Sequence, residues 1–157
     1  MSLSNDYIRG LIDGEGCFTF EKSRIFGSNG EISYRKIPSF RIQMHERDYV
    51  LLWSIANTLG LKNKIYRVGP YRKDGINRGK QVVLAVRDFG QLRNIIIPLF
   101  YGNRLIGHKR NQFLSWLEKM GTDPEIANRY KLLHRLHRSG YFQKELRKGG
   151  LFEEFVD

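Results

Sequence analysis

Apolar positions in the first third of the chain change from helical spacing to strict alternation. A helix is predicted to begin after Ser4, a residue type that often caps helices, and to end at the run Asp13-Gly14-Glu15-Gly16. Its apolar positions share one helical face: Tyr7, Ile8, Leu11 and Ile12. Alternating runs over 17–25 and 34–45 follow, separated by turn-forming residues at 27–30. These two runs predict a long β-hairpin.

The same order of elements recurs in the middle of the chain. Strands are predicted at 64–68 and 81–86, and helices over 48–59, 88–97, 109–120 and 125–137. Gly60 and Pro98 mark the expected ends of the first two of these helices, and Asp88 is an expected cap. The order α-β-β-α-β-β-α, with helices after it, indicates an α+β fold. One antiparallel four-stranded sheet would be covered by helices on one face.

Alternation gives the predicted hairpin two different faces. The apolar face would meet the helices: Phe18, Phe20, Phe40, Ile42 and Met44. The other face is polar: Thr19, Glu21, Ser23, Arg35, Ser39, Arg41, Gln43 and His45. A strand of about nine residues spans about 30 Å, roughly the length of nine base pairs of a duplex. The polar face is therefore long enough to follow half of an extended nucleic-acid site, although a merely solvated face would show the same pattern.

Charge changes this picture, because it is unevenly distributed. The chain has 27 Lys and Arg against 16 Asp and Glu, a net charge of +11. Residues 61–120 hold 13 basic and 3 acidic side chains, whereas residues 1–60 hold 7 of each. A basic zone confined to one stretch is typical of proteins that bind a polyanion, above all nucleic acid. RNA-binding and ribosomal proteins share this signal, and solubility alone is the simpler alternative.

Several other classes of protein are disfavoured by the sequence. No apolar run approaches the roughly 20 residues of a membrane span, and the first residues do not have the pattern of a secretory or transit peptide. The single cysteine, Cys17, excludes an internal disulfide and a cysteine-based zinc site. We therefore expect an intracellular protein. In a prokaryote it would lie in the cytoplasm with the nucleoid, and otherwise inside an organelle that encodes it.

The run from Ile8 to Gly16 is the sharpest local feature. Asp13 and Glu15 lie at a helix C-terminus, where the helix dipole disfavours acids by about 0.3–1 kcal/mol. Gly10 inside the helix costs about 1 kcal/mol relative to alanine. Two local costs at one place suggest a function. Gly10 and Gly14, four residues apart, leave a bare strip along which a second backbone can approach closely.

This run, IRGLIDGEG, resembles the signature of the LAGLIDADG homing endonucleases. It matches the signature at Gly10, Leu11, Ile12, Asp13 and Gly16. Gly14 stands at the small seventh position and Glu15 at the acidic eighth, whereas Ile8 and Arg9 depart from the usual Leu-Ala. The resemblance covers residues 4–120 of an expected single domain over 1–157, with a helical extension over about 121–157. It implies a saddle-shaped sheet, and the presence of one motif implies the branch that works as homodimers.

The resemblance also implies roles for particular residues. Glu15, with the backbone carbonyl of Gly14, would bind a divalent metal, Mg²⁺ or Mn²⁺, and Asp13 would order the helix end. Lys109 would stand beside the scissile phosphate, and Gln43 would orient the attacking water, with His45 as a weaker candidate. The motif helices of two protomers would pack through Ile8, Gly10, Leu11 and Gly14.

Recognition of DNA would fall to the polar face of the sheet and to the basic loop. The residues expected to face bases are Thr19, Glu21, Ser23, Arg35, Arg41, Gln43, Tyr66 and Lys80. Arg72, Lys73 and Arg78 in the loop would contact phosphates. The expected function is a metal-dependent double-strand cut in a long, partly palindromic DNA target. The alternatives are an RNA maturase of the same family that assists intron splicing, and a basic RNA-binding protein without catalysis.

Overall fold

The computed structural model describes residues 2–70, 72–73, 75–77, 79–102 and 104–147, with backbone alone for residues 72, 73, 76, 77 and 147. Its first half contains α1 (Asn5–Glu15), β1 (Gly16–Phe26), β2 (Ile32–His45), η1 (Glu46–Asp48), α2 (Tyr49–Leu59), β3 (Tyr66–Val68), β4 (Arg72–Lys73) and β5 (Ile76–Asn77). Its second half contains β6 (Gln81–Val86), α3 (Phe89–Gln91), η2 (Leu92–Ile96), α4 (Ile97–Phe100), α5 (His108–Thr122), η3 (Asn128–Tyr130), α6 (Lys131–Arg138) and α7 (Tyr141–Arg147).

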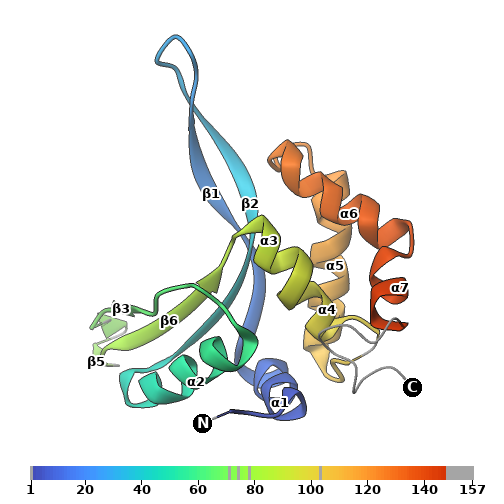
Figure 1. Ribbon diagram of the computed structural model, residues 1–157. Helices are drawn as coiled ribbons and strands as arrows, with labels where there is room; N and C mark the ends of the chain where they lie inside the picture. Colours follow the sequence, from blue (N-terminus) through green and yellow to red (C-terminus); the bar gives the residue numbers. More distant parts are fainter. Residues whose placement is uncertain (1, 71, 74, 78, 103, 148–157) are drawn as a thin grey trace.

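The main sheet has four antiparallel strands in the order β1-β2-β6-β3. Strand β1 pairs with β2 along the whole length of β1, from Gly16 opposite Ile42 to Phe26 opposite Ile32. Their outer halves form an arm that extends past the ends of the helices (Figure 1). The predicted α+β fold with one antiparallel four-stranded sheet is confirmed.

The core lies between the sheet and the helices on one of its faces. Phe18 is its centre, with ring centroids 5.0–5.4 Å from those of Phe40, Phe100, Phe113 and Trp116. The alternate residues of the central strand β6 enter the same core: Val82, Leu84 and Val86. The predicted apolar face of the hairpin is therefore the face that the helices cover.

The helix after β6 does not end at Pro98. Asp88 caps its start by accepting the Gln91 N–H at 2.9 Å, as predicted, but helical structure continues through Phe100. The reason is a π-helical turn, η2, in which the Ile97 N–H donates to the Leu92 carbonyl. A wider turn leaves room for the ring of a proline, which also lacks the N–H that an α-helical turn would need at that point.

Other differences from the predicted elements lie in loops and near the C-terminus. The basic loop contains a second small hairpin, β4–β5, that the glycine-rich sequence did not indicate. The helix predicted over 125–137 begins later, with η3 and α6, because residues 125–127 pair with β2 instead. Helix α7 lies in a stretch whose apolar pattern was too weak to predict one.

Residues 123–127 tie the C-terminal region to the middle of β2. Lys36 donates its backbone N–H to the Glu125 carbonyl at 2.9 Å and accepts the Ala127 N–H at 3.0 Å. Its ammonium lies 3.1 Å from carboxylate oxygens of both Asp123 and Glu125. The side-chain hydrogen bond to Asp123, followed by that to Glu125, raises the pKa of Lys36. One residue of the arm thus makes four polar contacts with a segment about 90 positions away.

A polar cluster joins α5 to α6. Glu118 contacts His134 and His137 at 3.4 Å each and Arg138 at 2.7 Å. The Tyr101 hydroxyl lies 2.6 Å from Nδ1 of His137. Burial lowers the pKa of His137, and the opposing attraction of Glu118 does not cancel this shift. Desolvation would raise the pKa of Glu118, but its contacts with His134 and Arg138 leave that pKa below the ordinary value.

Among the described residues, no helix is both long and apolar enough to cross a membrane.

Candidate functional site

Helix α1 divides into a buried and an exposed face. Ser4 caps it, since its Oγ accepts the Tyr7 N–H at 3.1 Å, as predicted. Ile8 and Ile12 are completely buried in the core of their own chain. Ile8 was predicted at a protomer interface; that prediction is wrong for its side chain, because the helix points it toward the sheet.

The outward face of α1 is formed by residues three or four positions apart: Tyr7, Gly10, Leu11 and Gly14. Tyr7 is 50% exposed, and Leu11 is half-buried. Apart from the adjoining residues and backbone of α1 itself, no heavy atom of the described chain lies within 4 Å of a Cβ built on Gly10 or Gly14. The bare strip predicted from the two glycines therefore exists and faces outward. Tyr7, which the apolar spacing grouped with Ile8 and Ile12 on one face, is a neighbour of this strip.

The junction between α1 and β1 requires the glycine that ends the motif. Gly16 is buried, and a Cβ built on it would lie 2.5 Å from Cγ2 of Ile12 and 3.0 Å from the Ile12 carbonyl oxygen. Its φ of −80° is accessible to any residue, so the restriction is steric rather than conformational. The chain can pass directly from helix to sheet because no side chain separates the two at this position.

The β1–β2 ladder ends where α1 meets the sheet. Its last pair is Gly16 opposite Ile42, and Glu15 and Gln43 are the chain neighbours of these two residues, Glu15 as the last residue of α1 and Gln43 in β2. Both side chains are exposed, and Gln43 is on the face of β2 that points away from the helices. Both residues therefore follow the last pair of the ladder at the junction of helix and sheet, and their joint role stays a prediction.

Asp13 connects the motif to the start of α5. Its two carboxylate oxygens accept the backbone N–H groups of Ile106, at 3.1 Å, and Gly107, at 3.2 Å. Gly107 is the N-cap of α5, and Lys109 is the second residue of that helix. Asp13 thus ties the end of α1 to the start of α5, the helix whose second residue is Lys109.

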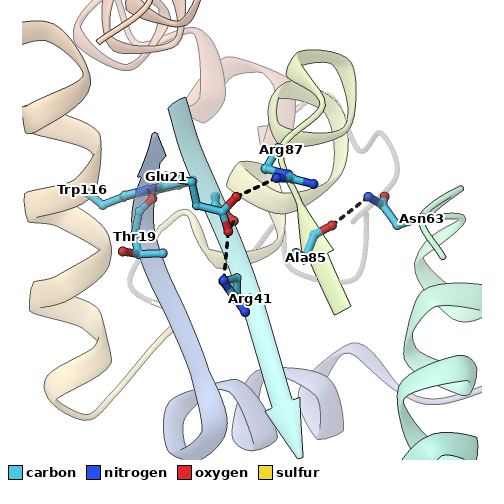
Figure 2. Close-up of polar contacts among 8 residues, drawn as sticks. Thr19, Glu21, Arg41, Asn63, Ala85, Arg87 and Trp116 are labelled. Atoms are coloured by element: carbon cyan, nitrogen blue, oxygen red, sulfur yellow. Dashed lines mark hydrogen bonds and ion pairs between the residues drawn. The ribbon is translucent and has the colours of Figure 1, made fainter. Parts of the chain in front are cut away.

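Helix α5 is further attached to the open edge of β1. The Gln112 side chain accepts the Phe18 N–H at 3.1 Å, and Nε1 of Trp116 donates to the Thr19 carbonyl at 2.8 Å (Figure 2). Residues four apart on one helix therefore satisfy backbone groups that an edge strand otherwise leaves exposed. These bonds, with those of Asp13, attach α5, and with it the backbone of Lys109, to β1 and α1.

The described residues contain no cluster of three or more His, Cys, Asp or Glu side chains that could hold a metal. What the helix end offers is one exposed carboxylate, Glu15, beside the Gly14 carbonyl in the last turn, where helix carbonyls lack intrahelical partners. Two hard oxygen donors suit Mg²⁺, which keeps several waters and often takes phosphate oxygens as further ligands. The donor set fits a cation shared with a bound phosphate.

The polar face of the sheet carries an ion-pair cluster that joins three strands. Glu21 Oε1 accepts from Nη1 of Arg41 at 3.0 Å and from Oγ of Ser39 at 3.3 Å. Its Oε2 accepts from Nη1 of Arg87 at 2.8 Å. Figure 2 shows Arg41 and Arg87 each reaching the carboxylate of Glu21. Val83 and Ala85 lie buried on this same face of the sheet, opposite Gln43 and Arg41. This face therefore has apolar residues on β6 beside polar residues on β2.

The remaining residues predicted to contact DNA lie where the pattern placed them or lie outside the description. Ser23 and Arg35 face each other near the middle of the arm, and Tyr66 and Lys80 are exposed on the sheet and beside it. The backbone of Arg72 and Lys73 forms β4, with nothing described of their side chains, and Arg78 lies outside the described residues.

Arg87 is the functional candidate that sequence analysis missed. It stands one residue beyond β6, so the predicted strand ended just before it. The alternation would have revealed it, because positions 83 and 85 lie on the polar face and 87 continues their parity. Its importance becomes visible in the fold, where it meets Glu21 from a strand 66 positions away.

Known proteins resemble this chain in sequence and in fold. A sequence profile described as LAGLIDADG endonuclease matches residues 8–120. Probable intron-encoded endonuclease 3 of Neurospora crassa is 32% identical over 111 residues, which make up 70% of this chain and 18% of that protein. This chain therefore spans less than a fifth of the fungal protein's length.

Solved structures of homing endonucleases share the fold. I-TnaI matches with a TM-score of 0.59 and 25% identity, over 92% of this chain and 81% of that one. I-LtrWI bound to target DNA matches with a TM-score of 0.55 and 28% identity, over 73% of this chain and 35% of that one. I-SmaMI, bound to uncleaved DNA in the presence of calcium ions, matches with a TM-score of 0.58 and 23% identity, over 87% of this chain and 44% of the I-SmaMI chain.

Proposed function

We propose that this chain, which belongs to the LAGLIDADG endonuclease family, is a homing endonuclease that acts as a homodimer and cuts both strands of a long DNA site. The observation that carries the proposal is the arrangement at the end of α1. Glu15 ends α1, Gln43 follows the last paired residue of β2 opposite β1, and Lys109 lies in the first turn of α5, whose start is bonded to Asp13 of α1. This arrangement supports a shared role for the three residues. Helix α1 also exposes a bare glycine strip to a partner.

In the proposed reaction, Glu15 and the Gly14 carbonyl would hold a divalent cation. Bound there, Mg²⁺ or Mn²⁺ would lower the pKa of a bound water and stabilise the leaving oxygen. The Gln43 amide orients the attacking water by hydrogen bonding from the sheet side. The Lys109 ammonium stabilises the negative charge that builds up on the phosphate. Asp13 acts through position, since both of its carboxylate oxygens are engaged by the start of α5.

The homodimer is proposed because one protomer supplies a single set of the proposed catalytic residues. Cutting two strands requires two sets of these residues, and the chain has one such motif. Packing α1 against its symmetry mate along Gly10 and Gly14 would place two Glu15 side chains near the two-fold axis. Gly10→Leu should then yield monomers with little cleavage, as measured by sedimentation and by nicking of target DNA. A wild-type protein that sediments as an 18.5 kDa monomer even on its target contradicts the proposed dimer.

The length of the arm sets the length of the proposed target. The part of β1 and β2 that could lie in a groove spans about nine base pairs per protomer, so the site would cover roughly 18–20 base pairs. I-LtrWI, one of the relatives in sequence and fold, has been captured on its target DNA. Partial symmetry of the target is expected because two copies of one chain would read it.

An RNA maturase of the same family is the second candidate. The name of the fungal relative, an intron-encoded endonuclease, connects this kind of sequence to introns. The exposed Glu15 favours cleavage, because a folding helper for RNA has no need of an acid that repels phosphates.

Incubation with DNA from the host locus tests the proposal. The DNA that flanks the gene, joined without the interruption, should be cut in both strands in Mg²⁺ and remain intact in EDTA. Binding of intron RNA without any cutting of this DNA would favour the maturase instead.

A further inference from the structure

We infer that Arg41 and Arg87, held side by side by Glu21, form one reading unit that recognises two guanines in each half-site. The inference rests on the proposed function, since it assigns a base preference to a surface proposed to face DNA. It also gives Glu21 a positioning role instead of the base contact predicted from the sequence.

Glu21 is already satisfied by its own chain. Its two carboxylate oxygens accept from Ser39, Arg41 and Arg87 at 2.8–3.3 Å, and its side chain is 19% exposed. A carboxylate with little remaining access is poorly placed to accept from a cytosine amino group. Its charge is balanced by two guanidiniums, so the cluster as a whole carries one positive charge toward DNA.

The two arginines keep the part of the guanidinium that reads guanine. Glu21 uses Nη1 of each side chain. The other side of the planar group, formed by Nε and Nη2, carries two parallel donors that match O6 and N7 of guanine. Their side chains are 36% and 45% exposed, so both can reach a groove while remaining anchored.

The spacing of the pair suits two base pairs of one half-site. Arg41 is paired with Ala85, and Arg87 follows two positions later, one residue past the end of β6, so the two arginines are diagonal neighbours. Such neighbours lie about 7–8 Å apart, or roughly two base-pair rises. The Arg87 backbone is fixed as well, because the Tyr130 hydroxyl donates to its carbonyl at 2.7 Å. Preorganised arginines lose less conformational freedom on binding than free ones.

The test begins with the full chain and a duplex DNA library randomised over 24 positions, selected for binding in Ca²⁺. Affinities are then measured for the selected consensus and for each single base-pair replacement. The wild type should recover a consensus with two guanine positions per half-site. Failure to recover any consensus overturns the proposed DNA function and this inference with it. A consensus without guanines at these positions overturns the inference alone.

Four variants separate reading from charge. Arg87→Ala should reduce discrimination at one guanine by about 5- to 150-fold. Arg87→Lys should keep the overall affinity but lose that discrimination, because an ammonium cannot make the paired contact. Glu21→Gln should weaken discrimination at both guanines together, while binding to unrelated DNA becomes tighter. Arg24→Ala is the matched control: it removes the same charge from an exposed arm residue of opposite parity and should leave the consensus unchanged.

Two results would overturn the reading unit. Full discrimination by Arg87→Lys would show that Arg87 supplies charge alone. Loss at a single guanine in Glu21→Gln would show that the two arginines are not held as one unit. A far-ultraviolet circular dichroism spectrum identical to wild type establishes that each variant is folded before its affinities are compared.

Discussion

The end of α1 and the Glu21 cluster lie on the same domain, but they are held in place by different means. At the helix end, position is set by the backbone: Gly16 leaves no room for a Cβ, and Asp13 binds two main-chain N–H groups. On the sheet, Glu21 and Arg41 are held by contacts between partly exposed side chains. The proposed catalytic residues therefore depend on backbone geometry that the fold fixes. The proposed base contacts depend on side chains that can be substituted without changing the fold.

The largest expected effect separates these two regions most directly. Glu15→Gln keeps the size of the side chain but removes the negative charge that a divalent cation needs. Cleavage should fall by several orders of magnitude while binding persists or tightens. Single-turnover cutting in saturating Mg²⁺, beside binding in Ca²⁺, measures both. The matched variant Glu31→Gln, at the exposed hairpin turn, should cut normally. Near-normal cutting by Glu15→Gln would remove the proposed metal ligand.

Lys109→Met should have the next largest effect. Loss of one electrostatic stabiliser of a transition state typically slows a reaction by about 10²–10³. The binding of uncut DNA should change little, because the residue acts on charge that develops during the reaction. Lys119→Met, at the other end of α5, is the control and should retain the wild-type rate. An equal loss in both variants would indicate a general contribution of charge and no special role for Lys109.

Gly16→Ala tests whether the helix end is sterically determined. Its new methyl group would meet Ile12 at 2.5 Å, and such overpacking typically costs about 1–3 kcal/mol of unfolding free energy. Gly10→Ala, in contrast, should stabilise the isolated protomer by up to about 1 kcal/mol. Urea unfolding at a protein concentration that keeps protomers apart gives both values. Equal unfolding free energies for the two variants would contradict the conclusion that Gly16 is sterically restricted whereas Gly10 is not.

The smallest expected effect concerns pH and a region remote from both sites. The pKa of His137 is lower in the folded chain than its ordinary value of 6.5. As pH falls through 6.5, the unfolded state gains a proton that the folded state resists, so stability decreases. The loss continues at lower pH as Glu118, whose folded pKa lies below 4.5, becomes protonated. His137→Gln should reduce the slope of unfolding free energy between pH 7 and 5.5, by less than one proton.

The sequence predicted the helix end better than the reading surface, and the reason is locality. Gly10, Asp13, Glu15 and Gly16 lie within seven positions, so their spacing could be interpreted directly. Lys109 was assigned by resemblance, and the Asp13 bonds to the start of α5 supply the physical reason for its position.

What could not be predicted depends on which strands become neighbours. Glu21 meets Arg87 because β6 pairs with β2 in one particular register, and nothing local in the sequence specifies that register. The burial of Ile8 against the outward position of Tyr7 also depends on the rotation of α1 toward the sheet, which apolar spacing alone left open. Elements close in sequence were therefore predictable, and contacts between distant strands were not.

The contacts of Lys36 with residues 123–127 fix the β1–β2 arm at its base and leave its outer end without such support. Below the attachment, the strands are fixed by the sheet, by α5 and by the C-terminal segment. Beyond it, the residues from Ser23 to Arg35 form a two-stranded ribbon held mainly by its own ladder, and such ribbons bend and twist readily. The arm is therefore stiffest near Lys36 and most flexible at its hairpin turn. Base pairs contacted near Lys36 would be recognised strictly. Base pairs contacted near the turn could change, as a target drifts over evolutionary time, with less loss of binding.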